Sequence, residues 1–309
     1  MDISFFTASV VAGTPLLYAI LGELITEKSG QLNLGVEGMM LMGAVIGFKT
    51  AITSGNPYLA LLGAMVAGGL GAFIYALLTV TFKANQVVSG LTLTIFGTGF
   101  AGFMGQGLMG QTIPPDMKLF FADFKIPFLG DIPVVGQIFF NQGALVYSGY
   151  LLTIIAGLYI YRTQIGLNLR AVGENTSAAD AAGINVSLYK YVHVIIGGVL
   201  CGLAGAYLSL VYIPSWQENV TAGRGWIAIA LVIFCKWNPY LVMIGAFLFG
   251  GLDIIGFRIQ KYDFNISQYI IDLLPYIVTI IILILASVRK SNSGSAPANL
   301  GVSYFREER

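Results

Sequence analysis

The side chains with ligating or acid–base chemistry are few, and most of them lie beside or inside apolar stretches. Three carboxylates, Glu23, Glu27 and Glu37, flank a small and polar stretch at residues 29–35. An ionisable group surrounded by hydrocarbon is costly, so its position indicates an interface with water, a structural partner or a functional role. We place Glu23 and Glu27 at an interface. For Glu37, a structural partner and a functional group are equally compatible with the sequence.

The sequence lacks the patterns that support catalysis or metal binding. It has no GxxxxGK[ST] phosphate loop and no HExxH pair. His193 is the only histidine, and Cys201 and Cys235 lie in apolar runs without CxxC or Cys/His spacing. We therefore expect no catalytic residue, no metal site and no cofactor bound by this chain.

The composition predicts an integral membrane protein. Of 309 residues, 56% are hydrophobic and 10% charged, whereas soluble domains have roughly 25% charged residues. A water-soluble fold of this length cannot bury so much apolar surface. The net charge of +1 gives no basic field for nucleic acid.

Apolar stretches divide the chain into membrane spans. A helix needs about 20 residues to cross a bilayer. We predict an all-α polytopic membrane protein with about nine transmembrane helices, within a range of eight to ten. The shortest stretch, 225–235, crosses only if the residues before it also enter the membrane. The nine stretches are 5–25, 36–52, 58–82, 86–106, 143–161, 191–212, 225–235, 240–257 and 269–288.

The longer links and the repeat described below suggest six sections. A proline-rich loop separates the fourth and fifth spans, and an Ala-, Asn- and Ser-rich link that we expect to form short helices follows the fifth. The sections are a first repeat half (1–106), an extracytoplasmic loop (107–142), a linking span (143–161), a cytoplasmic coupling segment (162–190), a second repeat half (191–288) and a cytoplasmic tail (289–309).

Lysine and arginine set the expected orientation, because they are more frequent on the cytoplasmic side. With 162–190 in the cytoplasm, that side has ten of these residues and the other side six. The N-terminus is then outside and the C-terminus cytoplasmic.

An internal repeat relates two segments. Residues 56–70 read NPYLALLGAMVAGGL and residues 238–252 read NPYLVMIGAFLFGGL, identical at nine of fifteen positions. The predicted topology makes the two copies cross in opposite directions. Inverted repeats of this kind place a solute site near the midplane, beside interrupted helices. Those interruptions correspond to residues 29–38, which include Asn33 and Glu37, and residues 219–225.

A polar stripe near the start of the fourth span could line such a path. Asn85, Gln86, Ser89 and Thr92 are spaced so as to share one helical face. Their side chains could hydrogen-bond a polar solute or a neighbouring helix. Phe96 follows one turn later and could contact an aromatic ring.

Four segments together closely resemble the permease subunits of ATP-binding-cassette importers of the ribose, branched-chain amino acid and nucleoside group. The likeness is greatest to nucleoside-importer permeases that work with a basic-membrane-protein type lipoprotein. Where sugar importers have a GGIDLS-like sequence, this chain has SGQLNL at 29–34, which favours a nucleoside. The segments are EKSGQLNLGVEGMML (27–41), NQVVSGLTL (85–93), GLNLRAVGENTSAADAAGIN (166–185) and TAGRGWIAIALVIFCKWNP (221–239).

The resemblance implies a type II importer fold in a bacterial cytoplasmic (inner) membrane. It implies four kinds of partner: an ATPase subunit that binds ATP and Mg²⁺, a second homologous permease, an extracytoplasmic solute-binding lipoprotein and a nucleoside. The segment 170–185 is loosely similar to the Glu-Ala-Ala loop through which importer permeases contact their ATPase. Its small residues suit a helix seated in a cleft, and Gly183 would end that helix. The implied coupling residues are Arg170, Glu174, Asn175, Ala178, Ala179 and Gly183.

The sequence leaves other functions open. One alternative is ATP-driven import of a simple sugar or another small polar solute. Another is an ion-coupled secondary transporter, which would need buried carboxylates such as Glu37 or Asp253 as coupling sites. An intramembrane enzyme is disfavoured by the scarcity of charge within the spans.

Overall fold

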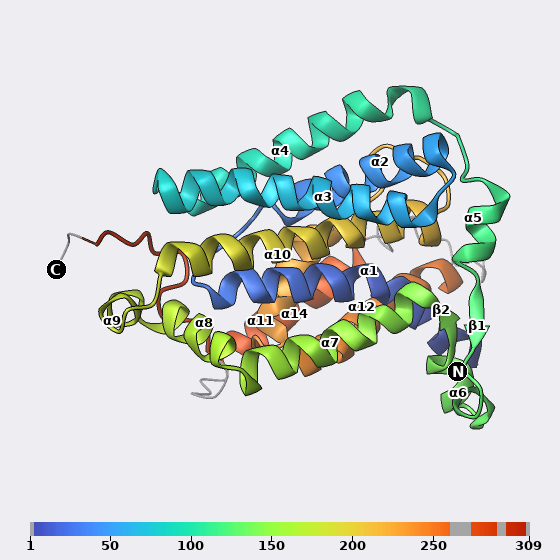
Figure 1. The fold of residues 1–309 in the computed structure, drawn as a ribbon. Coiled ribbons are helices and arrows are strands. Elements are labelled where there is room, and N and C mark those ends of the chain that lie inside the picture. The colour runs from blue at the N-terminus through green and yellow to red at the C-terminus, as the bar shows by residue number, and fades with distance from the viewer. Residues whose placement is uncertain (1–2, 260–272, 289–294, 307–309) are drawn as a thin grey trace.

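The computed structural model describes residues 3–259, 273–288 and 295–306 as an elongated helical bundle (Figure 1). Within these residues, seven helices are long and apolar enough to cross a membrane. Two shorter helices, α11 and α14, complete the nine predicted stretches, although residues 269–272 of the last one lie outside the described part. The seven are α1 (Ile3–Lys28), α2 (Val36–Ser54), α3 (Pro57–Ala76, continued by a π-helical turn Leu77–Thr81), α4 (Gln86–Gly105), α7 (Ala144–Arg162), α10 (Val186–Tyr207, continued by a π-helical turn Leu208–Tyr212) and α12 (Pro239–Ile259).

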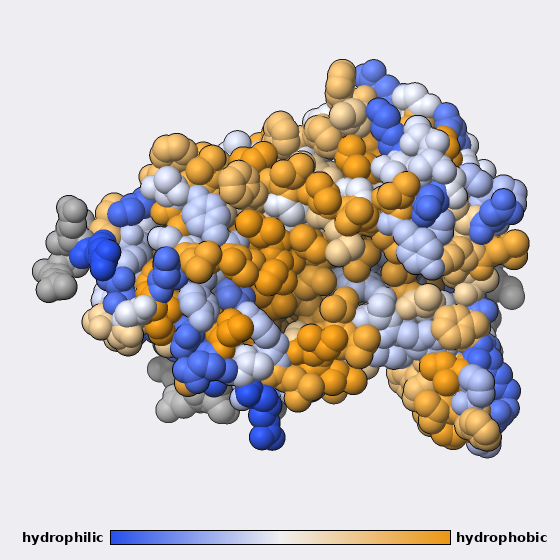
Figure 2. Space-filling model, in the orientation of Figure 1, coloured by the Kyte–Doolittle hydropathy of each residue, from blue (hydrophilic) through white to orange (hydrophobic). Residues whose placement is uncertain are grey.

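The surface agrees with a membrane location. Figure 2 shows hydrophobic residues gathered in a band across the middle of the molecule, with hydrophilic residues toward its two ends. One end contains the short helices α8 (Gln164–Glu174) and α9 (Thr176–Ala181); we call it the α8–α9 end. The other contains α5 (Pro115–Phe120) and α6 (Val135–Phe139); we call it the α5–α6 end.

The predicted inverted repeat is present. Asn56 caps α3 by accepting from the backbone N–H groups of Tyr58 and Leu59, and Pro57 occupies the first helical position. Asn238 accepts in the same way from the N–H of Tyr240 at the start of α12. Helix α3 begins at the α5–α6 end, where Tyr58 contacts Phe120. Helix α12 begins at the opposite end, so the two NPYL helices run in opposite directions.

Each half of the molecule repeats the same order of elements. A long helix (α1 or α10) is followed by an irregular stretch, a helix that starts inside the bundle (α2 or α11), the NPYL helix and a last helix (α4 or α14). Helix α11 covers Arg224–Phe234 and α14 covers Leu274–Val288. Helix α7 links the two halves. The predicted fold class, an all-helical polytopic protein built on an inverted repeat, is confirmed.

Glycine allows the central helices to approach closely. Gly202 of α10 lies against α3, and a methyl group added there would be 2.3 Å from the carbonyl oxygen of Ala64. Small residues at helix contacts are the usual way to pack membrane helices, because apolar burial gives little driving force within lipid. The packing of α2, α3 and α10 therefore depends on the absence of a side chain here.

A matched pair of glycines tests this packing. We expect Gly202→Ala to lower the free energy of unfolding by about 1–3 kcal/mol, the usual cost of overpacking. Gly99→Ala, also within a helix, has open space for the new methyl group and should be neutral or stabilising. Thermal unfolding of the two variants in detergent measures the difference, and equal midpoints would contradict the account.

The α5–α6 end contains a compact excursion between α4 and α7. It holds α5, a 3₁₀ turn (Leu129–Asp131), α6 and two three-residue strands, β1 (Asp123–Lys125) and β2 (Asn141–Gly143). The strands pair antiparallel, with Asp123 opposite Gly143. The sequence does not predict this pair of strands, because segments of three residues give no usable periodicity.

Candidate functional site

The two interrupted stretches meet at Glu37, which joins the two halves of the repeat. The Glu37 carboxylate accepts a hydrogen bond from Thr221 Oγ1 at 2.5 Å, from the Gly223 N–H at 2.9 Å and from the Gly225 N–H at 2.6 Å. Glu37 is 4% exposed. These donors form the N-terminus of α11, where unpaired N–H groups and the helix dipole favour a negative charge.

The backbone around this junction is shaped for that contact. Gly223 precedes α11 with a φ of +81°, a left-handed conformation that glycine adopts without strain. Gly225 lies so close to Glu37 that an added methyl group would be 2.5 Å from the Glu37 nitrogen. The sequence therefore places glycine where the loop must turn and where two backbones touch.

A second cluster of buried polar groups lies nearer the α8–α9 end than the Glu37 junction, and it contains Glu23 and Glu27. We expected both at an interface with water, but they are 0% and 2% exposed. Glu23 Oε1 accepts from the Asn33 N–H at 3.2 Å, and Glu27 accepts from the Trp237 indole N–H. The stretch 29–35 thus folds back along α1 to Glu23, and Trp237 covers Glu27, so both carboxylates are buried near the end of a helix.

This cluster also fixes the start of α2. The Asn33 side chain accepts from the Gly35 N–H at 2.8 Å. Gln86 Oε1 accepts from the Leu32 N–H at 2.7 Å, and the Tyr75 hydroxyl donates to the Leu32 carbonyl at 2.7 Å. Side chains from α3 and α4 therefore hold the irregular stretch that sequence analysis identified as an interrupted helix. Asn33 is fully buried, and its hydrogen bonds hold the stretch between α1 and α2 in place.

The polar stripe predicted on α4 has both buried and exposed members. Ser89 is buried, whereas Asn85 is exposed and caps α4 by accepting from the Val88 N–H at 3.0 Å. Thr92 is exposed and donates to the Val88 carbonyl at 2.8 Å, and Phe96 is 50% exposed beside Phe100. These positions do share one side of the helix, but contact with the start of α2 covers only part of that side, so the stripe has both buried and exposed members. Thr92 and Phe96 belong to an exposed face of α4 that points away from the described bundle.

A hollow near the N-terminus of α11 brings residues of the interrupted stretch 219–225 together with Asp253 and two tyrosines. It has a volume of about 380 Å³ and is lined in part by Tyr212, Asn219 and Tyr276. Arg224 pairs with Asp253 across it at 3.0 Å. The relevant signal is the interrupted stretch 219–225, which contains both Asn219 and Arg224.

Helices α8 and α9 form the surface predicted to couple to an ATPase. Asn175 caps α9 by accepting from the Ala178 N–H at 2.9 Å, and Gly183 ends the turn with a φ of +82°. Ala178 is exposed, while Ala179 is 3% exposed and packs with Val172. The two alanines thus have different environments, and only Ala178 is available to a partner.

The remaining predicted coupling residues lie at the joint between α8 and the C-terminal segment. The Arg170 guanidinium lies 5.7 Å from the centre of the Tyr161 ring. Glu174 Oε2 accepts from the Ala298 N–H at 3.2 Å, and the Asn299 N–H donates to the Gly173 carbonyl at 3.0 Å. The described part of the tail, 295–306, is therefore tied to this segment; residues 289–294 and 307–309 of the predicted tail lie outside the described residues.

Comparisons with known proteins agree over nearly the whole length. The family profile described as "Branched-chain amino acid transport system / permease component" matches residues 5–284. The chain is 39% identical to the putative glucose ABC transporter permease protein TsgC13 of Haloferax volcanii, over 97% of each chain. It is 34% identical to the guanosine ABC transporter permease protein NupQ of Bacillus subtilis, over 98% of this chain and 96% of NupQ. It is 33% identical to the nucleoside ABC transporter permease protein NupC of Lactococcus lactis, over 97% and 96% respectively.

Proposed function

Because this chain belongs to the family of branched-chain amino acid transport system permease components, we propose that it is the membrane-spanning subunit of an ATP-driven importer for a nucleoside. The observation that carries the proposal is the combination of the permease family with an inverted repeat whose interrupted helices meet at Glu37. In transporters of this construction, interrupted helices mark the region where the halves move against each other.

We assign ATPase coupling to the α8–α9 end. Ser177, Ala178, Ala181 and Ala182 are exposed small residues on one short helix and its end. Because these side chains are small, the exposed side of α9 can enter a cleft of a partner. Ala179, on the other side of α9, packs against Val172 of the same chain. ATP and Mg²⁺ are bound by the partner ATPase, and ATP hydrolysis belongs to that subunit.

The orientation follows from the placement of positive charge. Lys28, Lys83, Arg162, Arg170 and Lys236 lie toward the α8–α9 end, which favours a cytoplasmic location for that end. The N-terminus is then extracytoplasmic, the described tail is cytoplasmic, and the α5–α6 end faces a solute-binding lipoprotein. The membrane is the bacterial cytoplasmic (inner) membrane.

The exposed face of α4 is our choice for the solute path. Thr92 and Phe96 face out of this chain, where a second permease subunit would complete an enclosed route. Asn85 lies at the cytoplasmic end of that face. Three other predicted path residues are buried: Asn33, Glu37 and Ser89. We assign them to holding the helices of the two repeat halves in place, without contact with the solute. ATP binding drives transport only through a difference in stability between the outward-open and inward-open states.

The substrate choice rests on two relatives named for nucleoside or guanosine transport and on SGQLNL at residues 29–34. The relative named for glucose is a specific reason to test sugar as the second candidate. The test uses proteoliposomes that contain this chain with its second permease, ATPase and binding protein. We expect ATP-dependent uptake of radiolabelled guanosine that excess unlabelled nucleoside blocks and excess glucose does not. The reverse pattern identifies a sugar importer, and ATP-independent uptake driven by an ion gradient rejects ATP coupling.

A further inference from the structure

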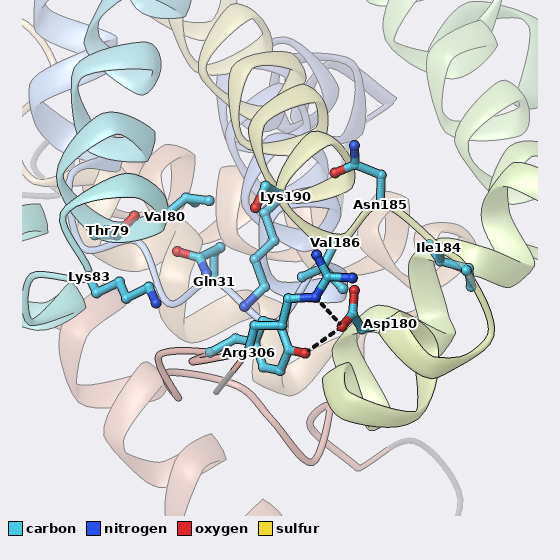
Figure 3. Close-up of a pocket in the computed structure, with 13 residues that line it drawn as sticks. Gln31, Thr79, Val80, Lys83, Asp180, Ile184, Asn185, Val186, Lys190 and Arg306 are labelled. Carbon is cyan, nitrogen blue, oxygen red and sulfur yellow. Dashed lines mark hydrogen bonds and ion pairs between the residues drawn. The ribbon is translucent and has the colours of Figure 1, made fainter. Parts of the chain in front are cut away.

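A basic hollow at the α8–α9 end is distinct from the helix junction and from the exposed face of α4. It has a volume of about 380 Å³, within the range of small-molecule sites. It lies between the α3–α4 turn, the start of α10 and the C-terminal segment. Figure 3 shows the side chains of Lys83, Lys190 and Arg306 directed toward the same space, with Gln31 between the two lysines.

Lys190 is a buried lysine that lines this hollow. It lies in the second turn of α10 and is 2% exposed. No hydrogen bond, ion pair or ring contact joins its ammonium group to another residue in the described part of the chain. A buried charge is stable only when it is paired or hydrogen-bonded. In its charged form, Lys190 would be stabilised by an anion that this part of the chain does not supply.

The neighbouring groups leave positive charge uncompensated. Asp180 is the carboxylate that lines the hollow, and it already accepts from Tyr304 at 2.9 Å and pairs with Arg306 at 3.2 Å. Lys83 lies 4.2 Å from the centre of the Phe305 ring, a contact that leaves its charge unneutralised. Two positive charges, those of Lys83 and Lys190, thus remain.

Uncharged donors complete the site. Asn185 caps α10 through the Leu188 N–H, and the N–H groups of Val186 and Ser187 have no acceptor among the described residues. Gln31 is 1% exposed and its Oε1 has no donor. Rotation of that amide by half a turn would present its NH₂ group to an anion.

We propose that this hollow binds a phosphate monoester. Such a group has a charge of about −1.5 to −2 at neutral pH and three acceptor oxygens, which matches two free lysines and the N-terminus of α10. Because Gln31 belongs to the interrupted stretch and Asp180 to α9, the bound ligand would link the coupling segment to the start of α2. The binding claim does not depend on the proposed transport function.

The phosphate could belong to a soluble phosphorylated compound or to an anionic lipid headgroup, and two arms separate these sources. In the first, thermal unfolding of the detergent-purified chain is followed with inorganic phosphate at constant ionic strength. In the second, native mass spectrometry counts phosphatidic acid, which carries a monoester, retained against phosphatidylcholine. Lys190→Met removes the unpaired charge and keeps the side-chain length, while Lys118→Met is a control at the exposed opposite end.

We expect phosphate to raise the unfolding midpoint of the wild type and of Lys118→Met, and Lys190→Met to lose that shift. Loss of one retained phosphatidic acid on Lys190→Met, with no phosphate shift in any protein, assigns the same site to lipid. Lys83→Met should weaken binding at least tenfold in whichever arm is positive. The proposal is overturned if neither probe binds, if Lys190→Met binds as well as the wild type, or if phosphate binds only after removal of residues 307–309, since the chain's own acidic end would then occupy the site.

Discussion

Glu37→Ala is expected to abolish solute uptake and to destabilise the chain more than any other single change described above. Two backbone N–H groups, those of Gly223 and Gly225, and the Thr221 hydroxyl all donate to this carboxylate. A buried donor left without an acceptor costs about 1–3 kcal/mol. The start of α11 would lose its contact with α2, and the two halves of the repeat would no longer be joined at this junction.

Three comparisons separate this effect from a general loss of negative charge. Glu218→Gln changes an exposed carboxylate in the same loop and should leave both uptake and the unfolding midpoint unchanged. Glu37→Gln should be intermediate, because the amide keeps one acceptor oxygen but turns a donor toward an N–H group. Thr221→Val should cost less than Glu37→Ala. If Glu37→Ala matched Glu218→Gln in unfolding and uptake, the junction would have no such role.

Ala178→Trp is expected to lower ATP-driven uptake at least tenfold while the chain stays folded. Ala178 is exposed on α9, so a large side chain there would point into solvent in the isolated chain but would prevent α9 from entering a cleft of the ATPase. The measurements are uptake, co-purification of the ATPase subunit and the unfolding midpoint. We expect the first two to fall and the third to stay within experimental error of the wild type.

Two further variants define the cause. Ala122→Trp places the same side chain at an exposed alanine of the opposite end and should leave ATPase association intact. Ala179→Trp alters a residue that is 3% exposed and packed with Val172, so it should lower the unfolding midpoint. Full ATPase association with Ala178→Trp would show that α9 does not contact the ATPase.

Local signals predicted the helices and their repeat. The Asn56-Pro57 and Asn238-Pro239 pairs encode a cap followed by a first helical residue, so the NPYL segments mark helix starts without any tertiary information. Gly183 ends α9 for an equally local reason. The apolar runs set the spans because a bilayer leaves the backbone few alternatives to a helix.

Long-range contacts explain what the sequence did not predict. The donors to Glu37 lie 184 to 188 residues away along the chain, and the indole that donates to Glu27 is 210 residues away. Nothing near Glu23 or Glu27 indicates that residues 29–35 fold back over them. The different exposure of Ala178 and Ala179 likewise depends on where Val172 lies, and the mixed burial of the α4 stripe depends on which part of α4 packs against α2.

Labelling of Ala178→Cys with a membrane-impermeant maleimide tests the central claim most directly. The native thiols of Cys201 and Cys235 are buried, so the background reaction is low. If α9 is cytoplasmic and contacts the ATPase, we expect no reaction in intact cells, reaction in inverted vesicles that lack the ATPase subunit, and protection when that subunit is present. Reaction in intact cells, or equal reaction in inverted vesicles with and without the ATPase, would contradict it.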